Sequence, residues 1–306
     1  HLFKWVDTAE DGAPVFAEPL MVEAAFKDKG SIFQRQDGVI IGLWISKDEL
    51  VTTEFDDEKL KFRETKREKL PKAVKSPSSL GVLVNKTGYD LAFEMSNGGK
   101  GPEGHPWSED WRPYNVSGIS NGELRYRYLI GWSSTGEVKQ MTKTKEEVFF
   151  SMHGITAMNL GQGHERDLIT GSRQGNLVFY RNKAVSGFDL EAKRLVAGED
   201  GNALRHPSIN PSVCAYPGGL IACGEGSLYF YRFTGTWAAT GAPVFVEPVS
   251  VLQEHADLYA GTLPSPTTVD WNGDGSLDVL AGNSEGFVLF FENIGIYYWI
   301  TRYGNK

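Results

Sequence analysis

Apolar and polar positions repeat in the same order three times in the second half of the chain. Segments 152–182, 210–235 and 265–295 each contain a short apolar stretch, a polar turn, a second apolar stretch that ends in glycine, and an aromatic stretch led by glycine. Short apolar runs bounded by Gly, Pro, Asn and Asp indicate β-strands joined by tight turns. Each segment therefore predicts three consecutive antiparallel strands.

The spacing of these segments predicts the architecture. Gly175, Gly226 and Gly286, which lead the aromatic stretches, are 51 and 60 residues apart. The octapeptides 12–19 and 241–248 agree at seven of eight positions and lie 229 residues apart, or four periods of about 57. Periods of about 40 to 60 residues with four strands each are typical of β-propeller blades. We expect an all-β propeller of about five four-stranded blades, with part of a seven-bladed ring as the alternative.

One propeller accounts for residues 1–306 as a single domain, because a ring of blades shares one continuous fold. The last repeat lacks the fourth strand that 243–245 supplies to the repeat before it. The N-terminal strand at 14–22 can fill this place, which would close the ring and remove two exposed sheet edges. Segment 96–114 interrupts the pattern as a long insertion rich in glycine, proline and aromatic residues.

The turn at 270–278 has the donor spacing of a calcium loop. Ca²⁺ takes six to eight oxygen ligands, which a short loop supplies when alternate residues point inward. The expected ligands are the side chains of Asp270, Asn272, Asp274 and Asp278 and the carbonyl oxygen of Ser276. Strand-like flanks and Ala281 at the twelfth position exclude an EF-hand. We expect one Ca²⁺ site; an Asx-rich turn without metal is the alternative.

These repeats and the acidic turn resemble the FG-GAP/VCBS-type repeat family of β-propellers. The resemblance covers the three repeats and the N-terminal remnant, and only the repeat at 265–295 keeps the full acidic loop. Similar propellers occur among secreted rhamnogalacturonan and ulvan lyases. The resemblance implies a secreted, cell-surface or periplasmic calcium-binding propeller that cleaves an acidic polysaccharide by β-elimination. A non-catalytic carbohydrate-binding propeller and an adhesion module remain the alternatives.

Candidate catalytic residues lie in the loops that lead into the inner strands. These are His153, Arg205, His206 and Tyr259. Such loops converge at one mouth of a propeller, so the four side chains are expected to share a site. An arginine would offset the uronate charge, while a neutral histidine or a tyrosine would move the C5 proton and protonate the leaving oxygen.

The aromatic insertion supplies candidate residues for binding the sugar rings. His105, Trp107, Trp111 and Tyr114 lie within it. Long loops in compact domains are usually functional or disordered, and aromatic residues favour order. The alternative is that these rings only pack the loop onto the blades.

Charge and hydropathy limit the classes of binding partner that the sequence favours. The formal net charge of −8 argues against general nucleic-acid binding. The chain contains no apolar run of 18 residues, so no membrane span is predicted. Residues 55–75 contain eight basic and five acidic residues, which indicates a solvated outer strand or loop, with a binding strip for a sulfated or uronate polymer as the alternative.

The two cysteines flank a predicted hairpin turn at Gly218 and Gly219. In that register Cys214 lies opposite Cys223, at the distance a cross-strand disulfide needs. A disulfide would fit an exported protein, and the start of the chain at His1 suggests either a mature exported form or part of a longer chain. Two buried reduced thiols are the equal alternative.

Overall fold

Every regular element that the computed structural model describes is a β-strand. The residues described are 2–8, 10, 14–20, 29–35, 37–56, 58–85, 88–96, 116–117, 127–142, 152–161, 163–172, 175–208, 211–253, 259–262, 264–283 and 288–293. Within them no helix is long and apolar enough to cross a bilayer.

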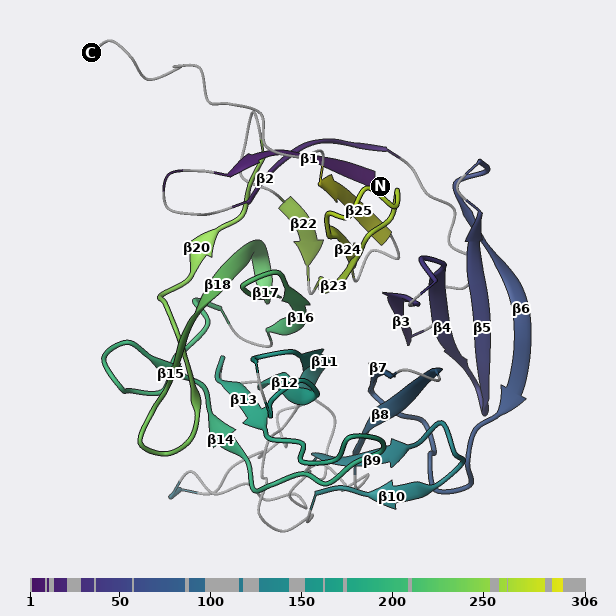
Figure 1. Cartoon of the computed structure of the whole chain (residues 1–306), viewed down its shortest axis with the longest axis horizontal. Coiled ribbons are helices and arrows are strands. Elements are labelled where there is room, and N and C mark those ends of the chain that lie inside the picture. Colours follow the sequence, from purple (N-terminus) through teal and green to yellow (C-terminus); the bar gives the residue numbers. More distant parts are fainter. Residues whose placement is uncertain are drawn as a thin grey trace.

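The strands form five sheets around a central axis, numbered here as blades 1 to 5 (Figure 1). Blade 1 contains β3 (Lys29–Gln34), β4 (Ile40–Ser46), β5 (Glu49–Asp56) and β6 (Lys61–Lys69). Blade 2 contains β7 (Ser79–Asn85), β8 (Gly88–Ser96), β9 (Arg127–Trp132) and β10 (Val138–Gln140). Blade 3 contains β11 (Met152–Met158), β12 (Asp167–Ser172), β13 (Leu177–Tyr180) and β14 (Arg194–Leu195).

The last two blades include additional short strands. Blade 4 contains β16 (Ser212–Tyr216), β17 (Gly219–Cys223), β18 (Glu225–Trp237) and β19 (Pro243–Phe245), joined by β15 (Ala197–Gly198), β20 (Val249–Ser250) and β22 (Tyr259–Thr262). Blade 5 contains β23 (Ser265–Val269), β24 (Asp278–Gly282), β25 (Val288–Asn293), β1 (Leu2–Thr8), β2 (Pro14–Leu20) and β21 (Leu252–Gln253). The predicted all-β fold with five blades is confirmed.

The inner strands β3, β7, β11, β16 and β23 contact one another in chain order around the axis. The Ala215 amide donates to Thr156 Oγ1 at 2.9 Å, and Thr268 Oγ1 donates to the Ala215 carbonyl oxygen. Thr267 Oγ1 donates to the Ile32 carbonyl oxygen at 2.6 Å, which links β23 back to β3. The ring is therefore closed by hydrogen bonds between inner strands.

Each pair of neighbouring blades buries its own apolar cluster, so the core is divided around the ring. Middle strands such as β12 and β17 are buried along their whole length because a blade covers each face. One representative of each cluster is Leu43 (blades 1 and 2), Leu168 (blades 2 and 3), Tyr231 (blades 3 and 4), Phe291 (blades 4 and 5) and Phe290 (blades 5 and 1). The last cluster shows that blade 5 packs on blade 1.

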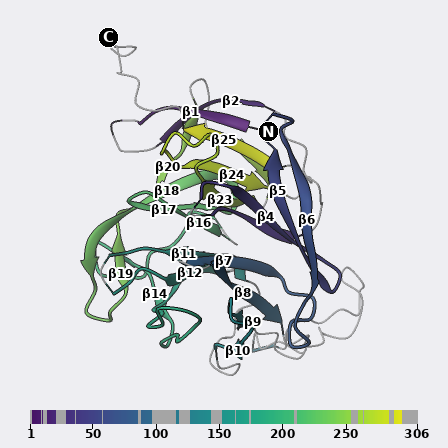
Figure 2. The same cartoon turned by 45° about the vertical axis from the view of Figure 1, so that its right-hand side comes forward.

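The N-terminal hairpin completes blade 5 (Figures 1 and 2). Strand β1 pairs in parallel with β25, with Leu2 opposite Phe290, and β2 pairs antiparallel with β1. Closure by the N-terminus is confirmed, but β1 takes the place next to β25 and β2 lies one position further out. A strand from the other end of the chain thus covers the edge that β25 would otherwise expose.

The hairpin of the two cysteines differs from the prediction by two residues. Tyr216 pairs with Gly219, so the turn is Pro217–Gly218, and Cys214 lies opposite Ile221. Proline has a fixed φ and no N–H for the ladder, and Gly218 has φ of 71°, which together suit the two central positions of a tight turn. Cys214 and Cys223 are buried and form no disulfide with each other, and the predicted pairing register was wrong.

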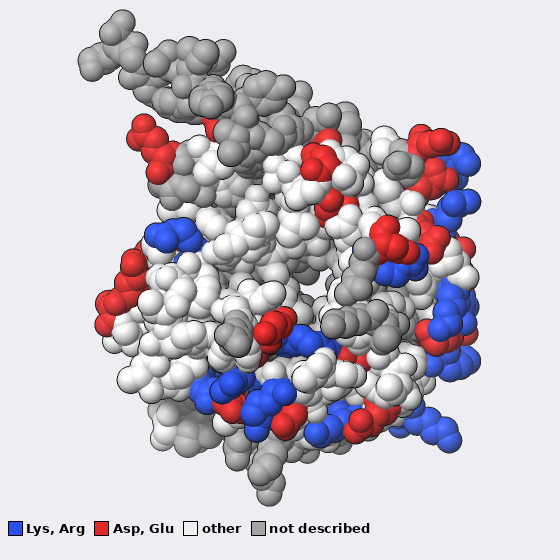
Figure 3. All heavy atoms as spheres, viewed as in Figure 1, with Lys and Arg blue, Asp and Glu red and all other residues white. Residues whose placement is uncertain are grey.

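Strand β6 is the outer strand of blade 1 and carries five of the eight basic residues of segment 55–75. Its cations pair with acids on the same sheet, as in Lys69 with Asp48 at 2.9 Å and Arg67 with Glu64 at 2.8 Å. Figure 3 shows both signs of charge intermingled along this edge. The interpretation as a solvated outer strand is confirmed, and the lysines also discourage edge-to-edge pairing.

Candidate functional site

The strand pairings define two faces of the ring. The start of β7 at Ser79 pairs with Glu94 near the end of β8, so the β8–β9 connection lies at the same end as the beginning of the inner strand. We call this end the starting face. The turns between first and second strands, including 270–277, lie at the opposite face, separated by the length of a five-residue strand.

The candidate catalytic positions all belong to the starting face. Arg205 forms a backbone bridge with Asn176, and Tyr259 pairs with Ser227. Asn176 and Ser227 each precede the first apolar residue of the third strand, so Arg205 and Tyr259 occupy equivalent positions in successive blades. His153 pairs with Gly171 at the beginning of β11. The side chains of His153 and Tyr259 lie outside the described residues.

Arg205 and His206 are neighbours that point in different directions. Arg205 is exposed, whereas His206 is only 5% exposed. His206 Nδ1 lies 2.6 Å from Tyr231 Oη, and the Tyr229 ring meets the imidazole edge-on with centroids 5.1 Å apart. Burial lowers the pKa of His206 to about 4, so the imidazole is neutral near pH 7. The structure therefore places Arg205 at the surface and His206 between blades 3 and 4.

A buried ion pair at this face was not found in the sequence analysis. The Glu94 side chain has no exposed surface, and Arg127 Nε lies 3.4 Å from its carboxylate. Ser79 Oγ donates to the same carboxylate at 2.8 Å, and Arg127 also donates to Ser78 Oγ. Only the strand pairing brings these residues together, because Glu94 and Arg127 are separated by the aromatic insertion.

The aromatic insertion begins next to this ion pair, two residues after Glu94. His105, Trp107, Trp111 and Tyr114 lie outside the described residues, and their assignment to sugar binding stays a prediction. The residue where the segment begins is described: Ser96 closes β8 and pairs with Arg127, which opens β9. The insertion is therefore rooted at the starting face, as are the candidate catalytic positions.

The predicted calcium turn lies at the opposite face and is held by its own side chains. Asp270 accepts the Gly273 and Gly275 amides at 2.8 and 3.0 Å. The Asn272 side chain accepts the Asp274 amide at 3.0 Å, and Asp274 accepts the Ser276 amide at 2.8 Å. Gly273 and Gly275 have positive φ, which lets the chain bend back at both positions.

The donor set fits a hard cation in part. Asn272 and Asp274 are exposed, and each carboxylate oxygen can still accept a second contact after one hydrogen bond. Asp278 differs because it is fully buried and accepts the Trp271 and Asn293 amides. Burial raises the pKa of Asp278 to about 7, and the nearby Glu292 and Asp274 carboxylates add to the shift. Within the described part of the chain, no three His, Cys, Asp or Glu side chains form a metal-binding group.

Asp278 has counterparts in two other blades. Asp167 at the start of β12 accepts the Asn182 amide at 2.8 Å, just after β13. Asp90 in β8 accepts the Ser134 amide at 2.7 Å, just after β9. Each is a fully buried carboxylate that accepts a backbone amide at the end of the third strand of its own blade or just after it. We call these three residues the blade caps.

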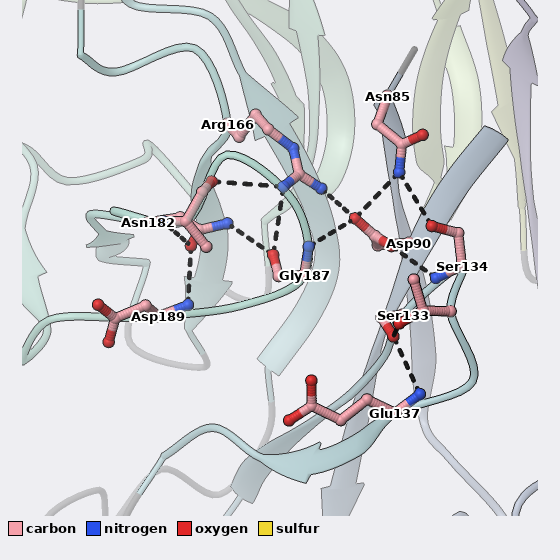
Figure 4. A network of polar contacts seen from close by, with 11 residues as sticks. Asn85, Asp90, Ser133, Ser134, Glu137, Arg166, Asn182, Gly187 and Asp189 are labelled. Atoms are coloured by element: carbon pink, nitrogen blue, oxygen red, sulfur yellow. Dashed lines mark hydrogen bonds and ion pairs between the residues drawn. The ribbon is translucent and has the colours of Figure 1, made fainter. Parts of the chain in front are cut away.

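The Asp90 cap also joins two blades (Figure 4). Besides Ser134, it accepts the Gly187 amide at 3.0 Å and Asn85 Nδ2 at 3.2 Å, and it pairs with Arg166. Burial alone would raise the pKa of Asp90, but these donors and the Arg166 charge hold it below its usual value. Asp90 is therefore an ionised link between blades 2 and 3.

Comparisons with known proteins show no family for this chain. No protein-family model matches it, and no curated protein matches it. A luciferin-regenerating enzyme of known structure has a TM-score of 0.44 and 11% identity, covering 94% of this chain and 83% of its own. Saccharomyces cerevisiae Sqt1 has a TM-score of 0.37 and 11% identity, covering 85% and 82%. Similarity this distant says nothing about function, and the FG-GAP/VCBS-type resemblance stays a prediction.

Proposed function

We propose that this chain is a saccharide-binding β-propeller that holds an acidic polysaccharide across its starting face. The observation that supports this proposal is that the candidate residues belong to segments attached to the same end of the ring. The aromatic insertion is rooted at Ser96 and Arg127, and Arg205 is exposed at the same end of the ring. A chain molecule lying across this face would meet tryptophan rings on blade 2 and a cation between blades 3 and 4.

Each part of the face has a chemical task in this proposal. Flat indole rings supply large contact areas for the apolar faces of sugar rings. The guanidinium of Arg205 suits a uronate carboxylate, because its planar donors bind carboxylates in a fork. In this proposal the protein is secreted, on the cell surface or in the periplasm, because its ligand is an acidic polysaccharide.

Binding is better supported than cleavage. A general base must come within hydrogen-bond reach of the proton that it removes. His206 is 5% exposed and is already bonded to Tyr231, so it serves as a support beneath Arg205 in this proposal. Lyase activity by β-elimination stays a prediction that depends on His153 and Tyr259.

Binding and cleavage are tested in one experiment. The protein is titrated with polygalacturonate, alginate and ulvan oligomers by calorimetry, and absorbance near 235 nm is followed to detect an unsaturated uronate. We expect saturable binding that weakens about tenfold in Trp107→Ala, Trp111→Ala and Arg205→Ala. Arg67→Ala, on the outer strand of blade 1, is the matched control and should bind normally. Absence of binding to every polyuronate would refute the proposal, and a rise at 235 nm that is lost in His153→Ala would establish the lyase.

We also propose that Ca²⁺ binds the turn at 270–276 and stabilises it. The exposed oxygens of Asn272 and Asp274 support this assignment, with water completing the six to eight ligands. Removing calcium with a chelator should lower the melting temperature, and Asp274→Ala should remove that response. Asp200→Ala is the control, because Asp200 forms a similar exposed turn with Asn202 at 2.9 Å outside any acidic series. An identical melt with calcium and with chelator would exclude the site.

A further inference from the structure

The interface between blades 1 and 2 is filled near the axis and open near its outer end. Close to the axis, Leu43 and Phe93 are fully buried in one cluster. Farther out, the same two blades leave a cleft of about 260 Å³. It is lined by Leu50, Lys66, Glu68, Gly88, Tyr89, Leu91, Trp132, Ser133, Ser134 and Gly136. None of these residues belongs to the starting-face set or to the calcium turn.

The outer strand of blade 1 has a β-bulge beside the cleft. Leu50 pairs with Glu68 and Thr52 pairs with Lys66, whereas Thr53 pairs with Glu64, so Thr65 is the extra residue. A bulge reverses which side chains face each side of the sheet. Leu50 packs toward blade 2, and its cross-strand partner Glu68 and the next residue on that side, Lys66, face the same way. Charged side chains therefore face blade 2 at this end of the interface.

Blade 2 presents two aromatic rings to this charged pair. Tyr89 and Trp132 are half-buried on the side of blade 2 that packs against blade 1. Lys66 Nζ and Glu68 Oε2 lie 2.9 Å apart, so their charges offset each other.

We propose that this cleft binds one neutral pyranose residue. Aromatic walls suit the apolar faces of a sugar ring, and a lysine–glutamate pair offers both donors and acceptors to its hydroxyl groups. The offset charges favour a neutral ring over an anion. Pockets for drug-sized ligands measure roughly 300–1,000 Å³, so a smaller cleft matches a single ring.

This site is independent of the acidic-polysaccharide proposal. The two sites use different residues, and the ligands differ in charge. A failure of polyuronates to bind the starting face leaves the cleft unaffected, and the reverse also holds. If both sites are present, the chain can hold a polymer that carries neutral and acidic residues.

Saturation-transfer NMR with neutral sugars tests the site. The probes are methyl glucoside, galactoside, mannoside and xyloside and their short oligomers, each added to the whole chain at millimolar concentration. We expect transfer to the ring protons of at least one configuration, with a Kd of about 1 mM. Trp132→Ala should weaken binding about tenfold, and Glu68→Gln about threefold to tenfold. Arg67→Ala is the control on the same strand, because Arg67 faces the other side of the sheet and should change Kd less than about twofold.

Several results would overturn the proposal. Absence of transfer to every neutral sugar would do so, as would transfer that is unchanged in both Trp132→Ala and Glu68→Gln. Binding of N-acetyl-tryptophanamide or N-acetyl-tyrosinamide without sugar binding would identify a peptide site instead. If Trp132→Ala does not fold by circular dichroism, Glu68→Gln and Lys66→Met decide the outcome, because both positions lie at the solvent-facing rim.

Discussion

Replacing Asp90 by asparagine should be among the most destabilising polar substitutions in this ring. The carboxylate is fully buried and accepts the Ser134 and Gly187 amides, Asn85 Nδ2 and the Arg166 guanidinium. Hydrogen bonds to a charged group contribute roughly 1.5–3 kcal/mol each. Asparagine keeps one acceptor oxygen but turns an NH₂ group toward N–H donors, and it leaves the Arg166 charge without its anion. Breaking a buried pair in this way costs about 3–5 kcal/mol.

Urea denaturation of four proteins measures this loss. We use a double-mutant cycle of wild type, Asp90→Asn, Arg166→Ala and the double variant. Because the two side chains are in contact, we expect a coupling free energy above about 1 kcal/mol between the two substitutions. Asp48→Asn with Lys69→Ala is the matched control; that pair lies 2.9 Å apart with side chains 73% and 69% exposed, and should couple by less than about 1 kcal/mol. A loss below about 1 kcal/mol in Asp90→Asn would refute the reasoning.

The pH dependence gives a second measure of the same contact. The folded pKa of Asp90 lies below its ordinary value of 3.8. A lowered carboxyl pKa contributes stability above the unfolded pKa and loses it as the pH falls through the folded pKa. The difference between wild type and Asp90→Asn should therefore be full at pH 7 and should shrink below about pH 3.8.

Three further predictions concern other parts of the ring. His206 has a folded pKa of about 4 against an ordinary 6.5, so the stability of wild type relative to His206→Gln should fall by about 3 kcal/mol between pH 6.5 and 4 in urea titrations across pH. Gly171→Ala should cost about 3 kcal/mol in the same assay, because a Cβ there would lie 1.6 Å from the Pro211 carbonyl oxygen; Gly282→Ala, with open space around it, should cost less than about 1 kcal/mol. Deleting residues 1–20 should lower the melting temperature and promote aggregation by exposing β25, and a peptide of residues 1–20 should restore the melt; an unchanged melt would contradict closure by β1.

The blade number and the closure were predictable because they depend on local patterns that recur. Blades 3, 4 and 5 show the same order of strands and turns, and the repeated octapeptide fixes the period. In blades 1 and 2 the sequence keeps only weak traces of the repeat. Blade 1 has a charged outer strand, and blade 2 is interrupted between Ser96 and Arg127 by the aromatic insertion. These two blades were predicted from the repeat period and not from a local sequence pattern.

The starting face was predictable as a place, but the directions of its side chains were not. Strand order alone brings the loops of His153, Arg205 and Tyr259 to one end of the ring. Whether Arg205 or its neighbour His206 faces solvent depends on Tyr229 and Tyr231, which belong to the next blade. The Glu94–Arg127 pair depends in the same way on strand pairing across the insertion. Because such contacts connect residues far apart in sequence, no short sequence motif predicts them.

The acidic turn shows how one pattern can combine two tasks. The sequence analysis treated Asp278 as the last member of a ligand series, yet Asp167 and Asp90 act as blade caps in loops that lack such a series. The cap alone therefore accounts for an aspartate at position 278. A signal for it was present, because Asp167 and Asn182 are separated by 15 residues, as are Asp278 and Asn293. In blade 4 the Gly218 carbonyl oxygen accepts the Phe233 amide at 2.9 Å, so the main chain performs the task where no aspartate does. The cap does not use Asn272 and Asp274 on the exposed part of the turn, and their oxygens already accept the Asp274 and Ser276 amides, so the chelator experiment separates a cation site from an Asx-rich turn without metal.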